Sequence, residues 1–136
     1  NASPELEASC AIYGQALGTA FQVIDDVLDY EGNAAEMGKN LGDDLREGKA
    51  TLPLILAMQR GTPPQRALIQ KAIETGSVDQ LSSVIAIVRE TGALEASRQA
   101  AMGEAQRAID AAEALPQGPY KEALVALASQ LLERRT

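Results

Sequence analysis

The chain has 136 residues, of which 46% are hydrophobic and only 3% aromatic, and its formal net charge is -7. This length fits one domain at most, and the composition favours packed helices over a sheet. The acidic balance argues against a nucleic-acid surface, and the lack of histidine excludes Ser-His-Asp and Cys-His catalysis. The single cysteine, Cys10, precludes an internal disulfide and fits a reducing compartment such as the cytoplasm.

The first predicted element is a long helix over residues 4–30. Residues 3–5 supply a capping hydroxyl, a proline at the first helical position and an acid in the first turn. The longest uncharged run, residues 8–24, contains several polar side chains, so we expect a core helix and no transmembrane segment. Gly14 and Gly18 would allow either a neighbouring helix or a ligand to approach the backbone closely.

Three carboxylates lie within five residues near the end of this helix. Asp25 and Asp29 are four residues apart and share a helical face, and Gln22 lies one turn earlier on the same stripe. Carboxylates this close repel one another, and a divalent cation offsets that repulsion. Oxygen-only ligands suit Mg²⁺, which binds through one or two carboxylates together with substrate phosphates. The stripe therefore predicts a magnesium site.

Residues 31–49 are expected to form an active-site loop, because glycine recurs there and breaks regular structure. Loops of this length in a compact domain are usually functional or disordered. Lys39 and Lys49 lie in this segment and are candidates for binding a diphosphate whose other side is held by metal. The alternative interpretation is a solvated charged loop.

Residues 50–136 are expected to form packing helices. Helix starts are predicted at a proline-containing turn in residues 51–53, at residues 62–63 and at a capping box in residues 77–80. The apolar positions at helical spacing are interpreted as core, not as a ligand site. These positions include Leu81, Val84, Ile85, Val88, Ala101, Ala105, Ala108, Ala112, Leu115, Leu124, Leu127 and Leu131. The predicted fold class is all-α.

Several motifs in fixed order carry a family resemblance. They are Tyr13-Gly14, Leu17-Gly18, Phe21-Gln22, Asp25-Asp26-x-x-Asp29, Gly38-Lys39, Gly42-x-Asp44-Leu45 and Glu47-Gly48-Lys49-x-Thr51-Leu52-Pro53. Together they resemble the C-terminal part of the trans-isoprenyl (polyprenyl) diphosphate synthases, and most of all the bacterial octaprenyl and related long-chain enzymes. The resemblance covers essentially the whole chain.

This resemblance implies the helical bundle of the class I isoprenoid (terpenoid) synthases and a cytoplasmic homodimer. The implied reaction is a Mg²⁺-dependent, head-to-tail condensation of isopentenyl diphosphate with an allylic prenyl diphosphate. Its product would be a long-chain all-trans polyprenyl diphosphate, with octaprenyl diphosphate for quinone side chains as the subfamily expectation.

For the metal, the resemblance implies that Asp25 is the main Mg²⁺ ligand and that Asp29 helps, either through ordered water or by supporting the ligands. Asp26 points about a quarter turn away and is expected to orient ligands or to bind a loop cation. Asp44 is expected to brace the metal-bound waters or Lys49.

For the substrate, Gln22 matches a pocket glutamine of the family. Lys39 and Lys49 match lysines that bind the allylic diphosphate. Thr51 is a weaker substrate-binding candidate, with a helix cap as the alternative role.

The chain departs from the family pattern because the first aspartate-rich motif and the upstream basic residues are absent from it. We therefore expect this chain alone to be inactive. A non-catalytic synthase-like subunit that partners or regulates a complete synthase is the alternative, although such a subunit would be expected to lose its aspartates or lysines. Terpene cyclases share the fold but carry a different second metal motif.

Overall fold

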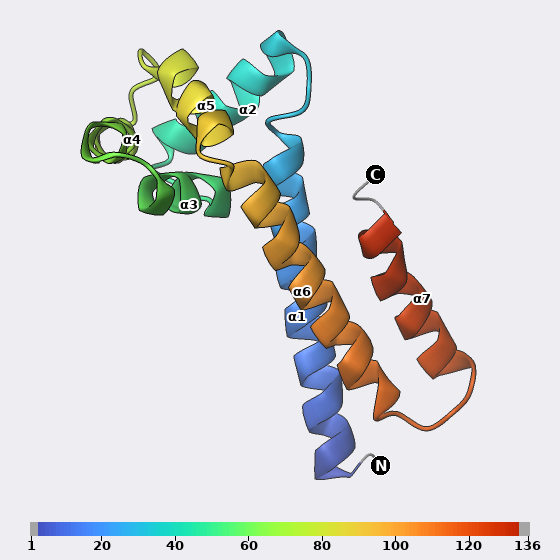
Figure 1. Ribbon diagram of the computed structural model, residues 1–136. Coiled ribbons are helices and arrows are strands. Elements are labelled where there is room, and N and C mark those ends of the chain that lie inside the picture. The colour runs from blue at the N-terminus through green and yellow to red at the C-terminus, as the bar shows by residue number, and fades with distance from the viewer. Residues whose placement is uncertain (1–2, 134–136) are drawn as a thin grey trace. The chain divides into compact units, whose positions relative to one another are not determined.

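The computed structural model describes residues 3–133, and this part of the chain forms seven helices and no strand (Figure 1). The all-α prediction is confirmed. No helix in the described residues is both long enough and apolar enough to cross a bilayer. The helices are α1 (Pro4–Leu28), α2 (Ala34–Arg46), α3 (Leu52–Arg60), α4 (Pro63–Thr75), α5 (Leu81–Glu90), α6 (Ala93–Glu113) and α7 (Pro119–Glu133).

Internal contacts divide the chain into two compact units. One unit holds the described residues up to 22 and from 98 onward, and the other holds residues 23–97. Helices α1 and α6 each contribute residues to both units.

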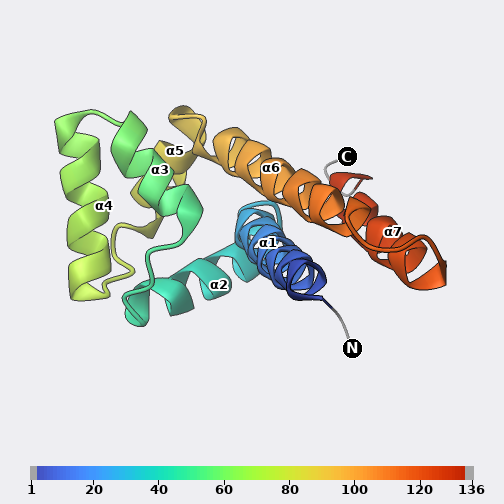
Figure 2. The same ribbon diagram turned by 90° about the horizontal axis from the view of Figure 1, so that it is seen from below.

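The first unit packs the N-terminal part of α1 against α6 and α7 (Figures 1 and 2). The Tyr13 hydroxyl donates a 2.7 Å hydrogen bond to the carbonyl of Leu124 and so ties α1 to α7. Cys10 lies on α1 with its side chain exposed. Small side chains allow the helices to approach closely, and the core is formed mainly by Ala16, Ala20, Ala105, Ala108, Ala112, Ala128 and Leu131.

The second unit packs helices α2 to α5 around a core of larger aliphatic side chains (Figures 1 and 2). Tyr30, just beyond the end of α1, belongs to this core and is 2% exposed. The other central residues are Met37, Leu41, Leu45, Leu54, Ala57, Ile69, Ala72, Val84, Ile87 and Val88.

Helix α2 corrects the expectation of a loop over residues 31–49. Asn33 caps the helix, because its side-chain oxygen accepts a 2.9 Å hydrogen bond from the amide of Glu36. Met37, Leu41 and Leu45 are spaced by four residues and are all buried, so a continuous apolar face packs into the core. This burial outweighs the poor helix propensity of two internal glycines. Only the short segments on either side of α2 are irregular.

The helix boundaries agree with most of the predicted start signals. Helix α1 begins at Pro4, and the hydroxyl of Ser3 accepts a 3.2 Å hydrogen bond from the amide of Leu6. The capping box lies at the start of α4, where the side chains of Thr62 and Gln65 each accept from the other's backbone amide. The capping box predicted in residues 77–80 is wrong, because α5 begins after Gln80 without a side-chain cap.

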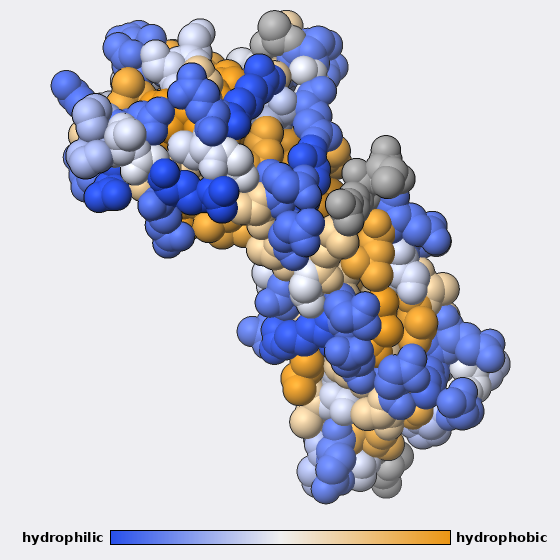
Figure 3. Space-filling model, in the orientation of Figure 1, coloured by the Kyte–Doolittle hydropathy of each residue, from blue (hydrophilic) through white to orange (hydrophobic). Residues whose placement is uncertain are grey.

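The core prediction is confirmed for most of the apolar stripe, but it is wrong for Leu127, which is 41% exposed. On the face shown in Figure 3, hydrophobic side chains are visible along α7. Gly14 and Gly18 are also exposed, and a methyl group at either position would meet no described atom within 4 Å. Within the described residues, no helix packs closely against these glycines.

Candidate functional site

The end of α1 presents its three aspartates in different environments. Asp25 is exposed and Asp29 is half-buried, whereas Asp26 is only 7% exposed. Neighbouring helical positions differ by about 100° in direction, so Asp26 turns toward the protein while Asp25 turns outward. Asp29 follows the last helical residue but keeps the helical register, because its amide donates a 3.2 Å hydrogen bond to the carbonyl of Asp25. Asp25 and Asp29 are therefore the accessible carboxylates of the motif.

Helix α2 places Asn40 beside Asp29. The Nδ2 of Asn40 donates a 3.3 Å hydrogen bond to Oδ1 of Asp29. The pKa of Asp29 is raised above its ordinary value, first by burial and then by the negative charges of Asp44 and Asp25. Lys49 and the Asn40 hydrogen bond act in the opposite direction. The fold thus concentrates negative charge around a carboxylate that is partly shielded from water.

The segment after α2 folds back over Asp44. Gly48 adopts a left-handed conformation with φ 69°, and the amide of Lys49 donates a 2.9 Å hydrogen bond to the carbonyl of Asp44. The Nζ of Lys49 lies 4.0 Å from Oδ1 of Asp44, which is an ion pair longer than a hydrogen bond. The Lys49 side chain is 46% exposed, so its ammonium group remains accessible to a second anion.

Burial is also the main reason why the pKa of Asp44 is raised. The charge of Lys49 lowers this pKa, and the charges of Glu47 and Asp43 raise it. In both Asp44 and Asp29, burial and neighbouring negative charges make the ionised carboxylate unfavourable. A bound cation would relieve this cost.

The remaining predicted site residues are Lys39, Thr51 and Gln22, and they differ in exposure and in the element that carries them. Lys39 is exposed on α2, on the side that carries the 2.8 Å ion pair between Arg46 and Asp43. Thr51 is buried at the N-terminal end of α3 and forms no side-chain capping bond.

Gln22 is exposed on α1 and belongs to the first unit, in contrast to the three aspartates. The structure brings Asp25, Asp29, Asp44 and Lys49 into one another's electrostatic field within the second unit, which also contains Lys39 and Thr51.

Sequence reasoning missed two residues of this cluster, Asn40 and Tyr30. Asn40 lies four residues before the predicted Asp44, which is the spacing of one helical face, but the segment was expected to be a loop. Tyr30 carries no motif that distinguishes it from an ordinary core residue. Its backbone is held by Arg89 of α5, whose Nη2 donates a 3.3 Å hydrogen bond to the carbonyl of Tyr30. Arg89 thereby stabilises the turn that follows Asp29.

The donor set fits a cation that is shared with a phosphate ligand. Among the described residues, no three acidic, cysteine or histidine side chains are grouped closely enough to hold a metal by themselves. Asp25 and Asp29 still offer two accessible carboxylates, and Mg²⁺ commonly takes one or two carboxylates with the rest of its shell from phosphate and water. The cluster is therefore suited to one side of a metal–phosphate contact.

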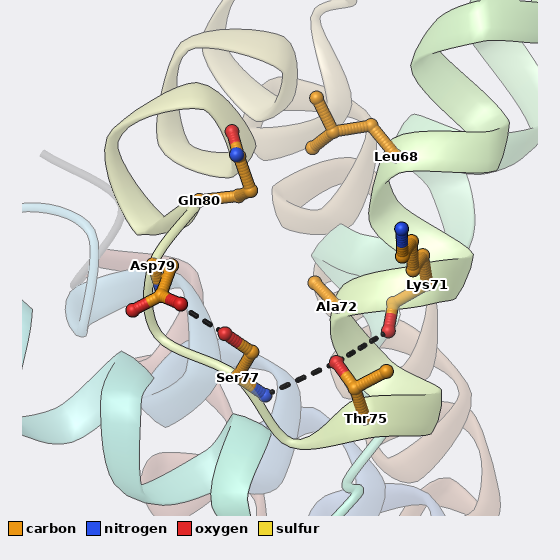
Figure 4. A pocket seen from close by; sticks show the side chains of 7 residues that line it. All are labelled: Leu68, Lys71, Ala72, Thr75, Ser77, Asp79 and Gln80. Atoms are coloured by element: carbon orange, nitrogen blue, oxygen red, sulfur yellow. Dashed lines mark hydrogen bonds between the residues drawn. The ribbon is translucent and has the colours of Figure 1, made fainter.

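A hollow of about 390 Å³ lies elsewhere, between the end of α4 and the segment that leads to α5 (Figure 4). The Thr75 hydroxyl at this hollow is used by the turn itself, because it donates to the carbonyl of Lys71 and accepts from the amide of Ser77. None of the predicted site residues lines it. We therefore interpret this hollow as a feature of the α4–α5 turn.

Comparison with known proteins identifies the family. Residues 1–88 match the model of the family described as polyprenyl synthetase. The chain is 50% identical over 123 residues to the octaprenyl diphosphate synthase of Haemophilus influenzae, covering 90% of this chain and 37% of that protein. It is 48% identical over 131 residues to the all-trans-nonaprenyl-diphosphate synthase (geranyl-diphosphate specific) of Rhodobacter capsulatus, covering 96% and 40%.

The fold agrees with these sequence relationships. The polyprenyl synthase of Caulobacter crescentus, solved with calcium and isoprenyl diphosphate, superposes with a TM-score of 0.77 at 36% identity. The match covers 99% of this chain and 42% of that structure. The chain thus spans about two fifths of the length of these relatives. The chain belongs to the polyprenyl synthetase family.

Proposed function

We propose that this chain is the second metal-binding part of a trans-polyprenyl diphosphate synthase, a transferase of prenyl groups. The observation that supports this most strongly is the grouping of Asp25, Asp29, Asp44 and Lys49 in one unit of a chain that belongs to this family. The substrates are isopentenyl diphosphate and an allylic prenyl diphosphate, which condense head to tail.

In this proposal the accessible carboxylates of Asp25 and Asp29 hold Mg²⁺, and the buried Asp26 orients the end of α1 around them. When bound, Mg²⁺ supplies electrostatic stabilisation of the departing diphosphate. The ammonium group of Lys49 binds the same diphosphate from the other side, since its 4.0 Å pairing with Asp44 leaves donor capacity free. No side-chain nucleophile takes part.

Lys39 acts as a second cation for the allylic diphosphate and reaches it from the exposed side of α2. Gln22 contacts the substrate from α1. Thr51 serves the site less directly, because its side chain is buried at the start of α3. Asp44 keeps Lys49 near the aspartates and braces the waters of the cation.

The proposal also covers the chain length of the prenyl product and the oligomeric state of the enzyme. We propose a cytoplasmic homodimer that makes octaprenyl diphosphate for quinone side chains. The Haemophilus influenzae relative supports an octaprenyl product, while the Rhodobacter capsulatus relative is named for a nonaprenyl product at similar identity. Chain length is therefore the part of the proposal that needs a direct product measurement.

The decisive experiment is a chimera. The chain replaces its matching segment in the Haemophilus influenzae octaprenyl diphosphate synthase, and condensation of labelled isopentenyl diphosphate with farnesyl diphosphate is measured with and without Mg²⁺. We expect long prenyl products from the chimera only with Mg²⁺, and no product from the chain alone. A folded but inactive chimera would contradict the proposal. Stimulation of an intact synthase by the chain alone would instead support a regulatory subunit.

Point variants of the chimera assign the roles. Asp25→Ala should lower kcat by a factor of at least about 100, because it removes the main carboxylate of the cation site. Lys49→Ala should mainly raise KM for the allylic diphosphate. Asp79→Ala and Lys71→Ala are matched controls, since these residues line the hollow at the α4–α5 turn. Equal losses in the controls would mean that the effects are not specific to the site.

A further inference from the structure

The C-terminal end of α1 is an electrostatically unfavourable place for carboxylates. Asp25 and Asp26 lie in the last turn of the helix, Asp29 follows it, and that turn contains no basic residue. The last carbonyl groups give this end of a helix a partial negative charge, which repels acidic side chains and favours a nearby cation. A basic residue from elsewhere in the chain would therefore stabilise the arrangement.

Arg89 of α5 supplies such a cation. Its Nη2 donates a 3.3 Å hydrogen bond to the carbonyl of Tyr30, a residue that is only 2% exposed. Within the same turn, the amide of Tyr30 donates a 3.0 Å hydrogen bond to the carbonyl of Val27. The amide of Glu31 donates one of the same length to the carbonyl of Leu28. The guanidinium group thus continues the series of donors that ends the helix.

The same guanidinium group also contacts α2. Its Nη2 lies 3.8 Å from Sδ of Met37, which precedes Asn40 by three residues on this helix. Asn40 is the residue whose side chain donates a hydrogen bond to Asp29. Arg89 therefore contacts both of the elements whose side chains meet in that hydrogen bond, the turn after α1 and helix α2.

The end of α5 that carries Arg89 is itself held. The Nε of Arg60 on α3 donates a 2.7 Å hydrogen bond to the carbonyl of Thr91. The Thr91 hydroxyl donates a 2.8 Å hydrogen bond to the carbonyl of Ile87, and both Ile87 and Val88 are buried in the core of the second unit. Arg89 therefore extends from an anchored helix end, and its planar guanidinium group can fix the position of a carbonyl.

We propose that Arg89 is a positioning residue for the cation site. Its hydrogen bond to the Tyr30 carbonyl holds the turn after α1, and this turn keeps the Asp29 carboxylate beside Asn40. Its positive charge also offsets part of the electrostatic repulsion at this end of the helix. The role in cation binding rests on the proposed function, whereas the hold on the turn does not.

The hold on the turn is tested in the metal-free chain by hydrogen exchange at single amides, measured by NMR. Arg89→Met removes the donor and the charge, so the amides of Tyr30 and Glu31 should exchange about tenfold faster. Arg66→Met is the matched control, because Arg66 donates a 3.0 Å hydrogen bond to the carbonyl of Met58 near the end of α3. It should leave those two amides unchanged. Equal acceleration in both variants, or none in Arg89→Met, would overturn the proposal.

A second pair of variants covers the case in which Arg89→Met does not fold. Arg89→Lys keeps the charge and loses the planar fork, so the amides of Tyr30 and Glu31 should exchange about threefold faster. Arg66→Lys should leave both amides unchanged. Identical exchange in the two lysine variants would contradict the proposed hold on the turn.

The role in cation binding is tested in the active chimera. Arg89→Met should raise the Mg²⁺ concentration for half-maximal activity about tenfold and change KM for isopentenyl diphosphate by about twofold or less. Arg89→Lys should cause a smaller increase, and Arg66→Met none. A fall in kcat at an unchanged Mg²⁺ requirement would contradict the positioning role. If Asp25→Ala leaves the chimera fully active, the proposed function fails, while hydrogen exchange at Tyr30 and Glu31 still decides whether Arg89 holds the turn.

Discussion

Asp29 is a carboxylate whose ionised form opposes folding and which the proposed function uses to bind a cation. Its side chain is half-buried, close to the charges of Asp44 and Asp25, and its pKa in the folded chain is raised. A raised pKa means that the fold favours the protonated form. The associated stability is complete below the unfolded value of 3.8 and is lost as the pH rises through the folded pKa. At neutral pH the ionised Asp29 therefore destabilises the chain, and the proposed cation would relieve this penalty.

Replacing this carboxylate by an amide should reverse the penalty. Asp29→Asn keeps the oxygen that accepts from Asn40 and removes the repulsion, so Tm at pH 7 should rise by about 1 to 3 °C. At pH 3, where Asp29 is already largely protonated, the change should be close to zero. Thermal melts at both pH values measure this, with the exposed Asp79→Asn as control. A lower Tm at pH 7 would show that the ionised form contributes a stabilising contact.

At the scale of elements, α2 is where sequence reasoning failed, and the reason is physical. Glycines at positions 38, 42 and 48 predict an irregular segment, and only the last of them ends a helix. The spacing of Met37, Leu41 and Leu45 indicates the apolar face of α2. The sequence interpretation favoured a loop because it gave more weight to the poor helix propensity of the glycines. Proline and capping signals predicted the starts of α1, α3 and α4 correctly because they act locally.

These glycines should respond differently to alanine. Gly38→Ala should stabilise the chain by about 0.5 to 1 kcal/mol, because this helical position has no described atom within 4 Å of the added methyl. Gly48→Ala should destabilise it by about 1 kcal/mol, because φ is 69° there. Urea unfolding of the two variants measures the difference. If both variants are stabilised, residues 47–49 adopt another backbone conformation in solution.

At the scale of the molecule, the sequence predicted the helical class and the family but not the division into two units. Helical spacing predicted which positions are buried. It could not predict which helices pack together, because that depends on contacts between residues far apart in the chain. The same limit applied to the site, where the aspartates were identified and their neighbours Asn40 and Tyr30 were not. The two core clusters share no residue.

This separation predicts local responses to cavity formation. Ile69→Ala, at a fully buried position of the second unit, should cost about 2 to 5 kcal/mol and increase hydrogen exchange mainly within residues 23–97. Leu131→Ala should produce the reciprocal pattern in the first unit. Hydrogen exchange mapped by mass spectrometry measures which residues lose protection in each variant. An equal loss of protection in both units would mean that the two cores unfold cooperatively.

The exposed Cys10 on α1 has a practical consequence for measuring the proposed homodimer. Because the sequence contains one cysteine, air oxidation can link two chains covalently but can never build a larger disulfide polymer. A dimer seen without reductant is therefore ambiguous. A dimer that persists in dithiothreitol, or after Cys10→Ser, reflects association through noncovalent contacts.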